Sequence, residues 1–338
     1  MKTYGPLIIE VHRGGLLESW HQGIAAVVDA GGKVLHAWGN VERQIYPRSA
    51  IKPLQALPLI ESGAAEAFGL DDSEIALACA SHSGEPTHVS AILAWLERMG
   101  LSMADLECGG HYSLDQLTAH DWIRAGTPVT AINNNCSGKH TGFLATAKHL
   151  GEPTAGYIES EHPVQVRLAA ILADMGDTDL SQTARGADGC GIPVIGMPLS
   201  AMALAMARMA DPSGLGASRE AAARRIVTSM AAYPHNVAGR NRFDTLAMRA
   251  GDGQLATKAG AEAVHAAILP ELGVGVALKI DDETNRASEV AMANILAFLG
   301  ILEPSQTAPM SNFIEAPLTN TLEDIVGVVR MANGWANC

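Results

Sequence analysis

Runs of apolar, β-branched residues broken by glycine mark the start of the chain. This pattern predicts strands in the segments LIIEVHRGG, LLESWHQGIAAVVD and GGKVLHAWG, which lie within residues 7–38. Gly31 and Gly32 separate the second segment from the third, as glycine pairs do at tight turns. We therefore expect a hairpin or a meander in this part of the chain.

From Ser49 onward the apolar residues take helical spacing. The segment IKPLQALPLIESGAAEAFG predicts a helix that begins at or just after Ser49, with Pro53 in its first turn, where a missing N–H costs little. Spacing of i, i+3 and i+4 recurs in VSAILAWLERMG, HPVQVRLAAILADMG and PLSAMALAMARMADP, each ended by Gly or Pro. The methionines and alanines of the last segment are interpreted as core packing.

A second β-rich stretch lies late in the chain. The segments QLATKAG and VGVALKIDD predict strands, and SEVAMANILAFLG predicts a final helix. Strands near both ends with helices between them favour an α/β fold of the α+β type, with a mainly antiparallel sheet built from both chain ends. We expect a single domain over residues 1–338, with a sheet lobe of 1–60 plus 225–338 and a mainly helical lobe of 61–224, because no linker separates them.

Composition and charge narrow the class of partner. The 338 residues are 48% hydrophobic, so the chain can bury a substantial core. A formal charge of −13, from 36 acidic and 23 basic residues, argues against nucleic acid as a partner, since no basic patch would release counterions. A small soluble substrate fits better.

The start of the chain and the cysteines indicate in which cellular compartment the protein is expected. The start has no pattern of a secretory signal, and no apolar run approaches the ~20 residues that span a bilayer. Five scattered cysteines, an odd number, are typical of reduced thiols. We expect a soluble, cytoplasmic protein that does not bind a membrane. The cysteines are Cys79, Cys108, Cys136, Cys190 and Cys338.

The first candidate for chemistry is Ser49-Ala50-Ile51-Lys52, an S-x-x-K motif. Residues three apart in a helix share one face, so the amine of Lys52 can reach the hydroxyl of Ser49. Serine is a weak nucleophile at neutral pH and needs a base, and a lysine serves as one only where burial or a second cation lowers its pKa. Alone, the motif is weak, and a helix-cap serine beside a solvated lysine is the simpler interpretation.

Two later motifs strengthen this interpretation. Ser81-His82-Ser83 follows the apolar run EIALACA, where we expect a sharp strand-to-loop turn, and Lys258-Ala259-Gly260 lies in the late β stretch. The order S-x-x-K, S-x-S, K-x-G resembles the S-x-x-K, S-x-N, K-T-G series of serine β-lactamases and penicillin-binding proteins. The order favours a serine and lysine site over a chance combination of a turn serine and a strand lysine.

Two cysteines lie in polar, glycine-rich segments. Cys136 precedes Lys139 and His140 at a predicted helix start, where the helix dipole favours a thiolate, and Cys190 lies in the glycine loop GADGCGIP together with Asp188. Two thiolates with Lys139 or His140 and a water can hold zinc. The spacing matches no zinc motif, so two buried free cysteines are an equal alternative.

Other residues are candidates for contact with substrate. Arg48 could clamp a carboxylate through two hydrogen bonds, and a surface salt bridge is an equal alternative. His140 is one of several histidines that could contact substrate, although most single histidines only satisfy a hydrogen bond. Gly239, in PHNVAGR, would permit close approach of backbone to ligand, and a plain turn is the simpler interpretation.

Together the motifs resemble those of the class 3, rhizobial-type L-asparaginases. The resemblance extends from about residue 8 to about residue 300 and is most specific in NNNCSGKHTG and GADGCGIP; the tail after residue 305 stays unassigned. It implies a fold similar to serine β-lactamases and penicillin-binding proteins, a homodimer, and hydrolysis of L-asparagine to L-aspartate and ammonia. The further matching motifs are VHRGGLLESWHQG, YPRSAIKPLQ, CASHSGEPTHV and TKAGAEAV.

The resemblance also implies roles for single residues. Ser49 would be the nucleophile paired with Lys52, and Ser81 a second serine paired with Lys258. Zinc would be held by three side chains and a water, with Asp188 as a neighbour of the metal or a partner of the substrate ammonium. These three side chains are Cys136, Lys139 and Cys190.

The predicted reaction is acyl transfer, and two other functions stay open. Lys52 would deprotonate Ser49, and ammonia would leave with a proton relayed through Ser81 and Lys258. A zinc-dependent amidohydrolase would instead activate water directly on the metal. A zinc- or redox-responsive binding protein would use the thiolates without turnover. Binding of a β-lactam is a weaker alternative, because Ser83 replaces the asparagine of the S-x-N motif.

Overall fold

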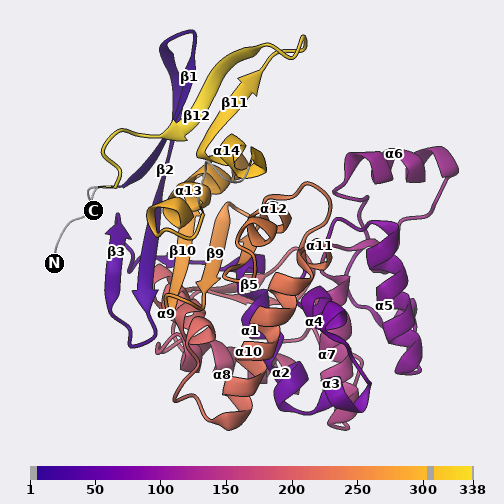
Figure 1. The fold of residues 1–338 in the computed structure, drawn as a ribbon. Helices are drawn as coiled ribbons and strands as arrows, with labels where there is room; N and C mark the ends of the chain where they lie inside the picture. The colour runs from indigo at the N-terminus through magenta and orange to yellow at the C-terminus, as the bar shows by residue number, and fades with distance from the viewer. Residues whose placement is uncertain (1–5, 303–307, 337–338) are drawn as a thin grey trace.

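Strands from both ends of the chain form one curled antiparallel sheet in this computed structural model, which describes residues 6–302 and 308–336. The path through the sheet is β11-β12-β1-β2-β10-β9-β8, and β3 pairs with β2 beside it (Figure 1). The strands are β1 (Leu7–Arg13), β2 (Leu16–Asp29), β3 (Val34–Trp38), β8 (Ala256–Gly260), β9 (Val264–Leu269), β10 (Val274–Ile280), β11 (Glu315–Thr319) and β12 (Ile325–Met331). The predicted α/β class with an antiparallel sheet from both chain ends is confirmed.

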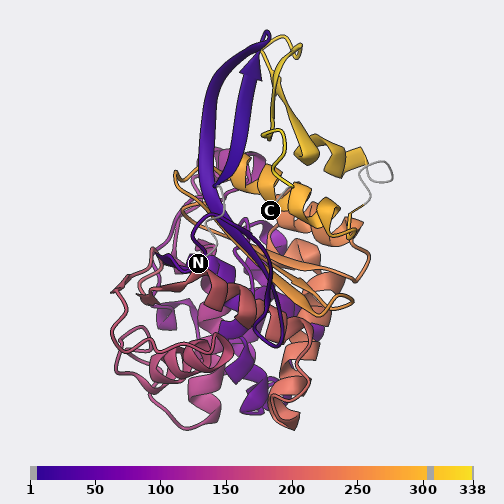
Figure 2. The same ribbon diagram turned by 90° about the vertical axis from the view of Figure 1, so that its left-hand side faces the viewer.

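The two ends of strand β2 lie in different environments. Its first half pairs with β1 and is largely exposed, whereas its second half pairs with β10 and β3 and is buried. The exposed half therefore projects beyond the body of the protein with β1, β11 and β12 (Figures 1 and 2). The predicted strands at the start of the chain and the turn at Gly31 and Gly32 are confirmed.

Two helices bury the centre of the sheet. Helix α9 (Leu199–Ala210) packs against β2, β9 and β10, and helix α13 (Asn285–Phe298) packs against β1, β10 and β12. Gly275 of β10 allows α9 to come close, because a Cβ there would lie 2.2 Å from the carbonyl oxygen of Ala203. Strand β10 is consequently buried along nearly its whole length.

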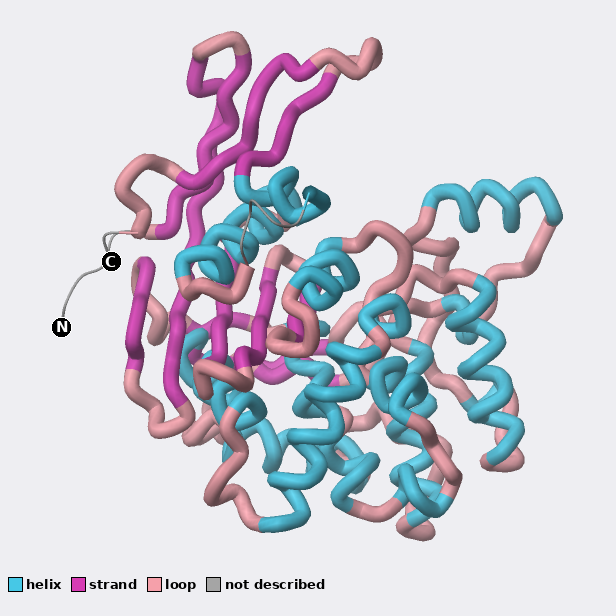
Figure 3. Tube along the Cα trace, in the orientation of Figure 1, coloured by secondary structure: helices cyan, strands magenta, loops and turns pink. Residues whose placement is uncertain are grey.

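The middle of the chain folds into helices that gather beside the sheet (Figure 3). The helices predicted from VSAILAWLERMG, HPVQVRLAAILADMG and PLSAMALAMARMADP are confirmed as α5, α8 and α9. The remaining bounds are η1 (Arg48–Ile51), α1 (Lys52–Gln55), α2 (Leu57–Glu61), α3 (Ala64–Ala67), α4 (Asp72–Ala78), α5 (Pro86–Arg98), η2 (Met103–Asp105), α6 (Gln116–Ala125), η3 (Ala131–Asn133), α7 (Ser137–His149), α8 (Pro163–Met175), α10 (Ala217–Ala232), α11 (Pro234–Val237), α12 (Phe243–Ala250) and α14 (Ala308–Ile314). Short strands β4 (Gln44–Ile45), β5 (Arg185–Ala187), β6 (Pro193–Ile195) and β7 (Met197–Pro198) form two small ribbons.

The strand expected before Ser81 is wrong. The run EIALACA lies in helix α4 and in the turn that follows it. Asp71 begins the helix as its N-cap, because its side chain accepts from the backbone N–H of Glu74 while the Glu74 side chain accepts from that of Asp71. A short apolar run is compatible with either a buried strand or a buried helix, and here the capping box decides for the helix.

Among residues 6–302 and 308–336, no helix combines the length and the apolar character needed to cross a bilayer. The division into lobes at residues 60 and 225 stays a prediction. Four of the cysteines are buried free thiols, and Cys338 lies outside the described residues.

Candidate active site

Lys52 connects three of the motifs identified in the sequence: its own S-x-x-K motif, the Ser81 turn and the Cys136 segment. Its side chain is only 1% exposed, and its amine donates to the Ser81 hydroxyl at 2.9 Å, to the Cys136 sulfur at 3.1 Å and to the Ala80 carbonyl. The amine thus lies among three acceptors, one each from the Ser81 turn, the Cys136 segment and the backbone. In this arrangement Lys52 reaches the second serine motif instead of Ser49, which lies three residues before it.

Ser49 is the partly exposed serine of the site. It lies in η1, and its side chain forms no hydrogen bond to the described part of the chain. Arg48, directly before it, has a φ of 50°, a left-handed conformation that side chains seldom adopt and that often occurs at functional sites. Gly260 allows strand β8 to lie against this turn, since a Cβ there would lie 3.2 Å from the backbone nitrogen of Ser49.

Lys258 extends from strand β8 into the same buried region. Its amine donates to the carbonyl of Ala259 at 2.5 Å and forms no hydrogen bond with Ser81. Burial lowers the pKa of Lys258 to about 7, with Lys52 and Arg242 acting in the same direction. Lys258 can therefore change its protonation state near neutral pH, as an acid or base in catalysis must.

Cys136, Lys139 and Cys190 lie together beside Lys52. The Lys139 amine is 3.0 Å from the Cys190 sulfur, and the Lys52 amine is 3.1 Å from the Cys136 sulfur. The neighbouring Cys190 side chain and the charges of Lys52 and Lys139 hold the pKa of Cys136 well below its ordinary value, against the effect of burial. The two sulfurs fit the donor set of a zinc ion, and the Lys139 amine would join them only in its neutral form, since an ammonium has no lone pair.

Arg48 and Asp188 form an ion pair at the rim of this cluster. The Arg48 Nε lies 2.8 Å from a carboxylate oxygen of Asp188, in the tight loop between β5 and β6. Burial alone would raise the pKa of Asp188, but Lys139 and Arg48 outweigh it and lower that pKa. The rim thus presents a positive and a negative group side by side.

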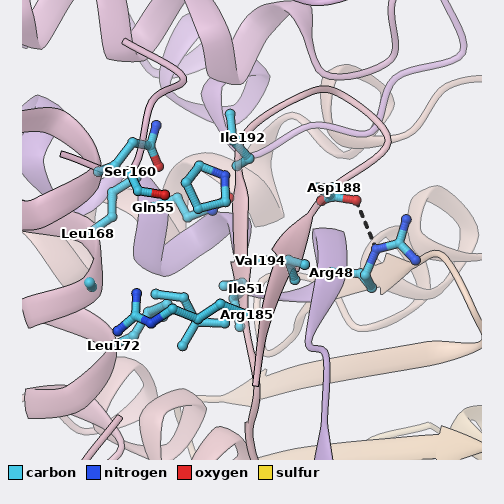
Figure 4. Close-up of a pocket in the computed structure, with 14 residues that line it drawn as sticks. Arg48, Ile51, Gln55, Ser160, Leu168, Leu172, Arg185, Asp188, Ile192 and Val194 are labelled. Carbon is cyan, nitrogen blue, oxygen red and sulfur yellow. Dashed lines mark hydrogen bonds and ion pairs between the residues drawn. The ribbon is translucent and has the colours of Figure 1, made fainter. Parts of the chain in front are cut away.

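A small pocket adjoins this ion pair (Figure 4). Its enclosed space is about 30 Å³, which is roughly the room for one water molecule. Arg48 and Asp188 belong to its lining but Ser49 does not, so the pocket extends the rim away from the serines. The other lining residues are Ile51, Gln55, Ser160, Gln165, Leu168, Ala169, Leu172, Arg185, Ile192, Pro193, Val194 and Ile195.

Two further predicted substrate contacts lie in packed surroundings. His140 is fully buried, its Nδ1 is 2.8 Å from the Tyr157 hydroxyl, and its Nε2 has no partner among the described residues. Gly239 has a φ of 119°, and a Cβ there would lie 2.4 Å from the hydroxyl of Ser83. Packing against the S-x-S turn therefore explains this glycine.

A third cluster has the residue types of a metal site but not free donor atoms. Potential ligand atoms of Glu85, His88 and His235 lie within 4.8 Å of one another. Both ring nitrogens of His88 already form hydrogen bonds to backbone groups, at 3.2 Å and 2.9 Å. Glu85 accepts the backbone N–H of Arg240 at 2.8 Å. A cation would have to displace these bonds, so the cluster serves the packing of helix α5.

The sequence reasoning singled out neither Ser137 nor Asp244. Ser137, at the start of α7, lies 3.0 Å from the ring of His82, and Asp244, in α12, accepts the backbone N–H of Ala259 next to Lys258. Asp244 belongs to AGRNRFDTL, a segment that fits the resemblance but carries no recognisable catalytic spacing.

A family model described as L-asparaginase II matches residues 9–331, nearly the whole chain. No curated protein matches the sequence.

Solved structures that resemble this chain have β-lactamase-like folds. A β-lactamase from Mycobacterium bovis is 13% identical, with 83% of this chain and 95% of that chain covered and a TM-score of 0.43. A simvastatin synthase mutant from Aspergillus terreus is 12% identical, with 79% and 87% covered and a TM-score of 0.40. A D-alanine carboxypeptidase from Burkholderia cenocepacia is 13% identical, with 86% and 93% covered and a TM-score of 0.38. At these scores the similarity carries no argument about chemistry.

Proposed function

Since the chain belongs to the L-asparaginase II family and is therefore an amidohydrolase, we propose that it hydrolyses the side-chain amide of L-asparagine by serine acyl transfer. One observation supports the mechanism: two serines and two buried lysines lie near one another where η1 meets strand β8. These residues are Ser49, Ser81, Lys52 and Lys258.

Ser49 is the nucleophile in this proposal because its hydroxyl is accessible and uncommitted. A nucleophile must approach the carbonyl carbon of the substrate to about 3 Å. Ser49 is partly exposed, whereas Ser81 is only 5% exposed and already accepts a hydrogen bond from Lys52. Ser81 is better suited to relay a proton than to attack.

The two lysines divide the proton transfers. Ser49 Oγ forms a bond to the amide carbon while its proton passes to neutral Lys52. The C–N bond then breaks, and ammonia leaves with a proton delivered through Ser81 and Lys258, whose pKa of about 7 suits that exchange. Water attacks the resulting ester and gives a proton to Lys258 through Ser81, L-aspartate leaves, and Lys52 returns its proton to the Ser49 oxygen.

The Arg48 and Asp188 pair supports recognition of a free amino acid. L-Asparagine carries an α-carboxylate and an α-ammonium, and this rim offers a guanidinium and a carboxylate 2.8 Å apart. We assign Arg48 to the carboxylate and Asp188 to the ammonium.

We further propose that Cys136, Lys139 and Cys190 hold zinc, with a water as the remaining ligand. Their donor set supports this, since a borderline-soft cation prefers thiolate and nitrogen ligands. Bound there, zinc would act as a Lewis acid toward a nearby carbonyl oxygen. The cytoplasm, where thiols stay reduced, suits these cysteines.

Ammonia release from L-asparagine and from L-glutamine, by protein of known zinc content, tests the proposal. Ser49→Ala should abolish release and leave the fold intact, as judged by circular dichroism. Substantial residual activity in Ser49→Ala would reject Ser49 as the nucleophile and point to Ser81 or to the zinc-dependent alternative. No release from either substrate by folded, zinc-loaded protein would favour a binding protein without turnover.

A further inference from the structure

A buried carboxylate binds the two neighbours of Lys258 in strand β8. Asp244, in helix α12, is only 2% exposed, and its side chain binds groups on both sides of Lys258 in strand β8. One oxygen accepts the backbone N–H of Ala259 at 2.9 Å, and the other is 3.4 Å from the Thr257 hydroxyl. Helix α12 thus fixes the strand immediately before and immediately after the lysine.

His265 of strand β9 completes this arrangement. Its Nε2 lies 2.9 Å from Asp244 and 3.0 Å from the Thr257 hydroxyl, which also lies 2.9 Å from the carbonyl oxygen of Ala266. The other ring nitrogen of His265 has no partner among the described residues. One buried carboxylate therefore ties together α12, β8 and β9.

Among the charges around Lys258, the Asp244 carboxylate most favours the ammonium form of the lysine. Burial alone would raise the pKa of Asp244, but His265 and Lys258 outweigh it and hold that pKa far below its usual range. Burial, Lys52 and Arg242 disfavour the Lys258 ammonium, while Asp244 and, less strongly, Cys136 favour it.

Two other acidic groups near this lysine contribute less. Burial raises the pKa of the Cys79 thiol to about 12, so it stays uncharged near neutral pH. Glu289 of α13 faces Asp244 and His265, and burial raises its pKa. Asp244 is thus the carboxylate whose removal would change the charge opposite Lys258 most.

We propose that Asp244 is a positioning residue of the reaction: it aligns strand β8 on both sides of Lys258 and supplies a buried negative charge beside that lysine. Asp244 acts through Lys258 and does not touch the substrate. Its effect on turnover rests on the proposed role of Lys258 as proton donor, whereas its effect on the lysine itself does not.

Asp244→Asn separates charge from shape. The amide oxygen can still accept the Ala259 N–H, and the amide nitrogen can donate to His265 Nε2 if the ring proton moves to Nδ1. Loss of the negative charge should lower the pKa of the Lys258 amine by about one unit or more. Nitrogen NMR of the lysine side chains, with the Lys258 signal assigned by its loss in Lys258→Met, measures this pKa in the full-length protein.

The pH profile of kcat/KM supplies the second readout. If Lys258 donates a proton, the alkaline limb in Asp244→Asn should move to lower pH by the same amount as the NMR pKa. Thr257→Val is the matched control, because it removes a hydrogen bond of the same network without changing charge, and it should leave both pKa values in place. If Asp244→Asn does not fold, Asp244→Ser, also uncharged, takes its place.

The outcomes distinguish the role of Asp244 from the role of Lys258 as the proton donor. An unchanged NMR pKa in the uncharged variant, or an equal shift in Thr257→Val, overturns the role of Asp244. A lowered NMR pKa with an unmoved activity profile supports Asp244 as the counter-ion but rejects Lys258 as the proton donor.

Discussion

The amine of Lys52 lies 2.9 Å from the hydroxyl of Ser81, although the S-x-x-K spacing predicts Ser49 as its partner. The contact joins helix α1 to the turn after helix α4 and leaves Ser49 without a hydrogen bond to the described residues. Ser81 is thus bound to the lysine while Ser49 is not, and the first prediction tests the role of Ser81.

Ser81→Ala should lower kcat by about 10²- to 10⁴-fold, the usual contribution of a positioned proton-transfer group. KM should change little, because Ser81 is buried and would not contact the ground-state substrate. Steady-state kinetics on L-asparagine measure both. Ser83→Ala is the control, since the Ser83 hydroxyl is equally buried but donates to the Ala238 carbonyl, and it should keep kcat within a few-fold. A larger loss in Ser81→Ala than in Ser49→Ala would make Ser81 the nucleophile.

Arg48→Gln should lower kcat/KM for L-asparagine by about 10- to 100-fold, mostly through KM, because the charge that recognises the α-carboxylate is lost. Arg185→Gln is the control, since Arg185 lines the same pocket without pairing with Asp188. L-Asparagine with an amidated α-carboxyl group gives a second check: the loss in Arg48→Gln should largely disappear with it. An equal loss with both substrates would mean that Arg48 supports the loop instead of the substrate.

Cys190→Ala should lose bound zinc, as measured by elemental analysis of protein purified with zinc and then dialysed. Removal of one of three protein ligands leaves an incomplete site. Cys79→Ala is the control, because Cys79 is a buried thiol near Lys52 that does not belong to the cluster, and it should retain the metal. Equal zinc content in the two variants would place the metal elsewhere.

Stability should rise with pH across the alkaline range because of Lys258. Its folded pKa of about 7 lies below the ordinary value of 10.5, so the unfolded chain binds more protons between these limits. The free energy of unfolding should increase there by at most about 1.4 kcal/mol per pH unit from this group, and the slope should vanish below pH 7. Chemical denaturation at several pH values should give a flatter dependence in Lys258→Met and an unchanged one in Lys33→Met, where the lysine is exposed. Identical slopes in wild type and Lys258→Met would contradict the lowered pKa.

Local patterns predict most of the sheet but not strand β9. Glycines mark the turn between β2 and β3, and β-branched runs mark the strands. The turn before β9 instead uses Glu262 and Ala263 with φ of 62° and 51°, residues that give no turn signal, so VHAAIL went unpredicted. The tail after residue 305, which the motifs leave unassigned, contributes β11 and β12.

The sequence patterns predicted most residues of the candidate site but not the contacts between them. Motif spacing identifies Ser49, Lys52 and Ser81, but the partner of Lys52 depends on where the turn after α4 lies relative to Lys52, which spacing does not show. A single acidic residue such as Asp244 has no recognisable motif, because its role depends on its contact with strand β8, which the sequence pattern does not show.

We propose that the projecting strands form the surface of the homodimer that the resemblance implies. Leu16 is 69% exposed and Trp20 60% exposed on β2, and Ile325 is 74% exposed on β12. Large apolar side chains clustered on projecting strands are costly to leave in water and are typical of surfaces that bind a partner. We expect a second copy of the chain to cover them.

Trp20→Glu should therefore convert the dimer to a monomer in light scattering after size-exclusion chromatography. Burial of an unpaired carboxylate in an apolar interface is strongly unfavourable. Leu117→Glu is the control, since Leu117 is similarly exposed, at 63%, but lies on helix α6 away from the projecting strands (Figure 1). A wild-type monomer, or dissociation by Leu117→Glu alone, would reject this surface. A monomeric Trp20→Glu protein that keeps its activity would further mean that each chain carries a complete site, as expected where Ser49, Lys52, Ser81 and Lys258 all come from one copy.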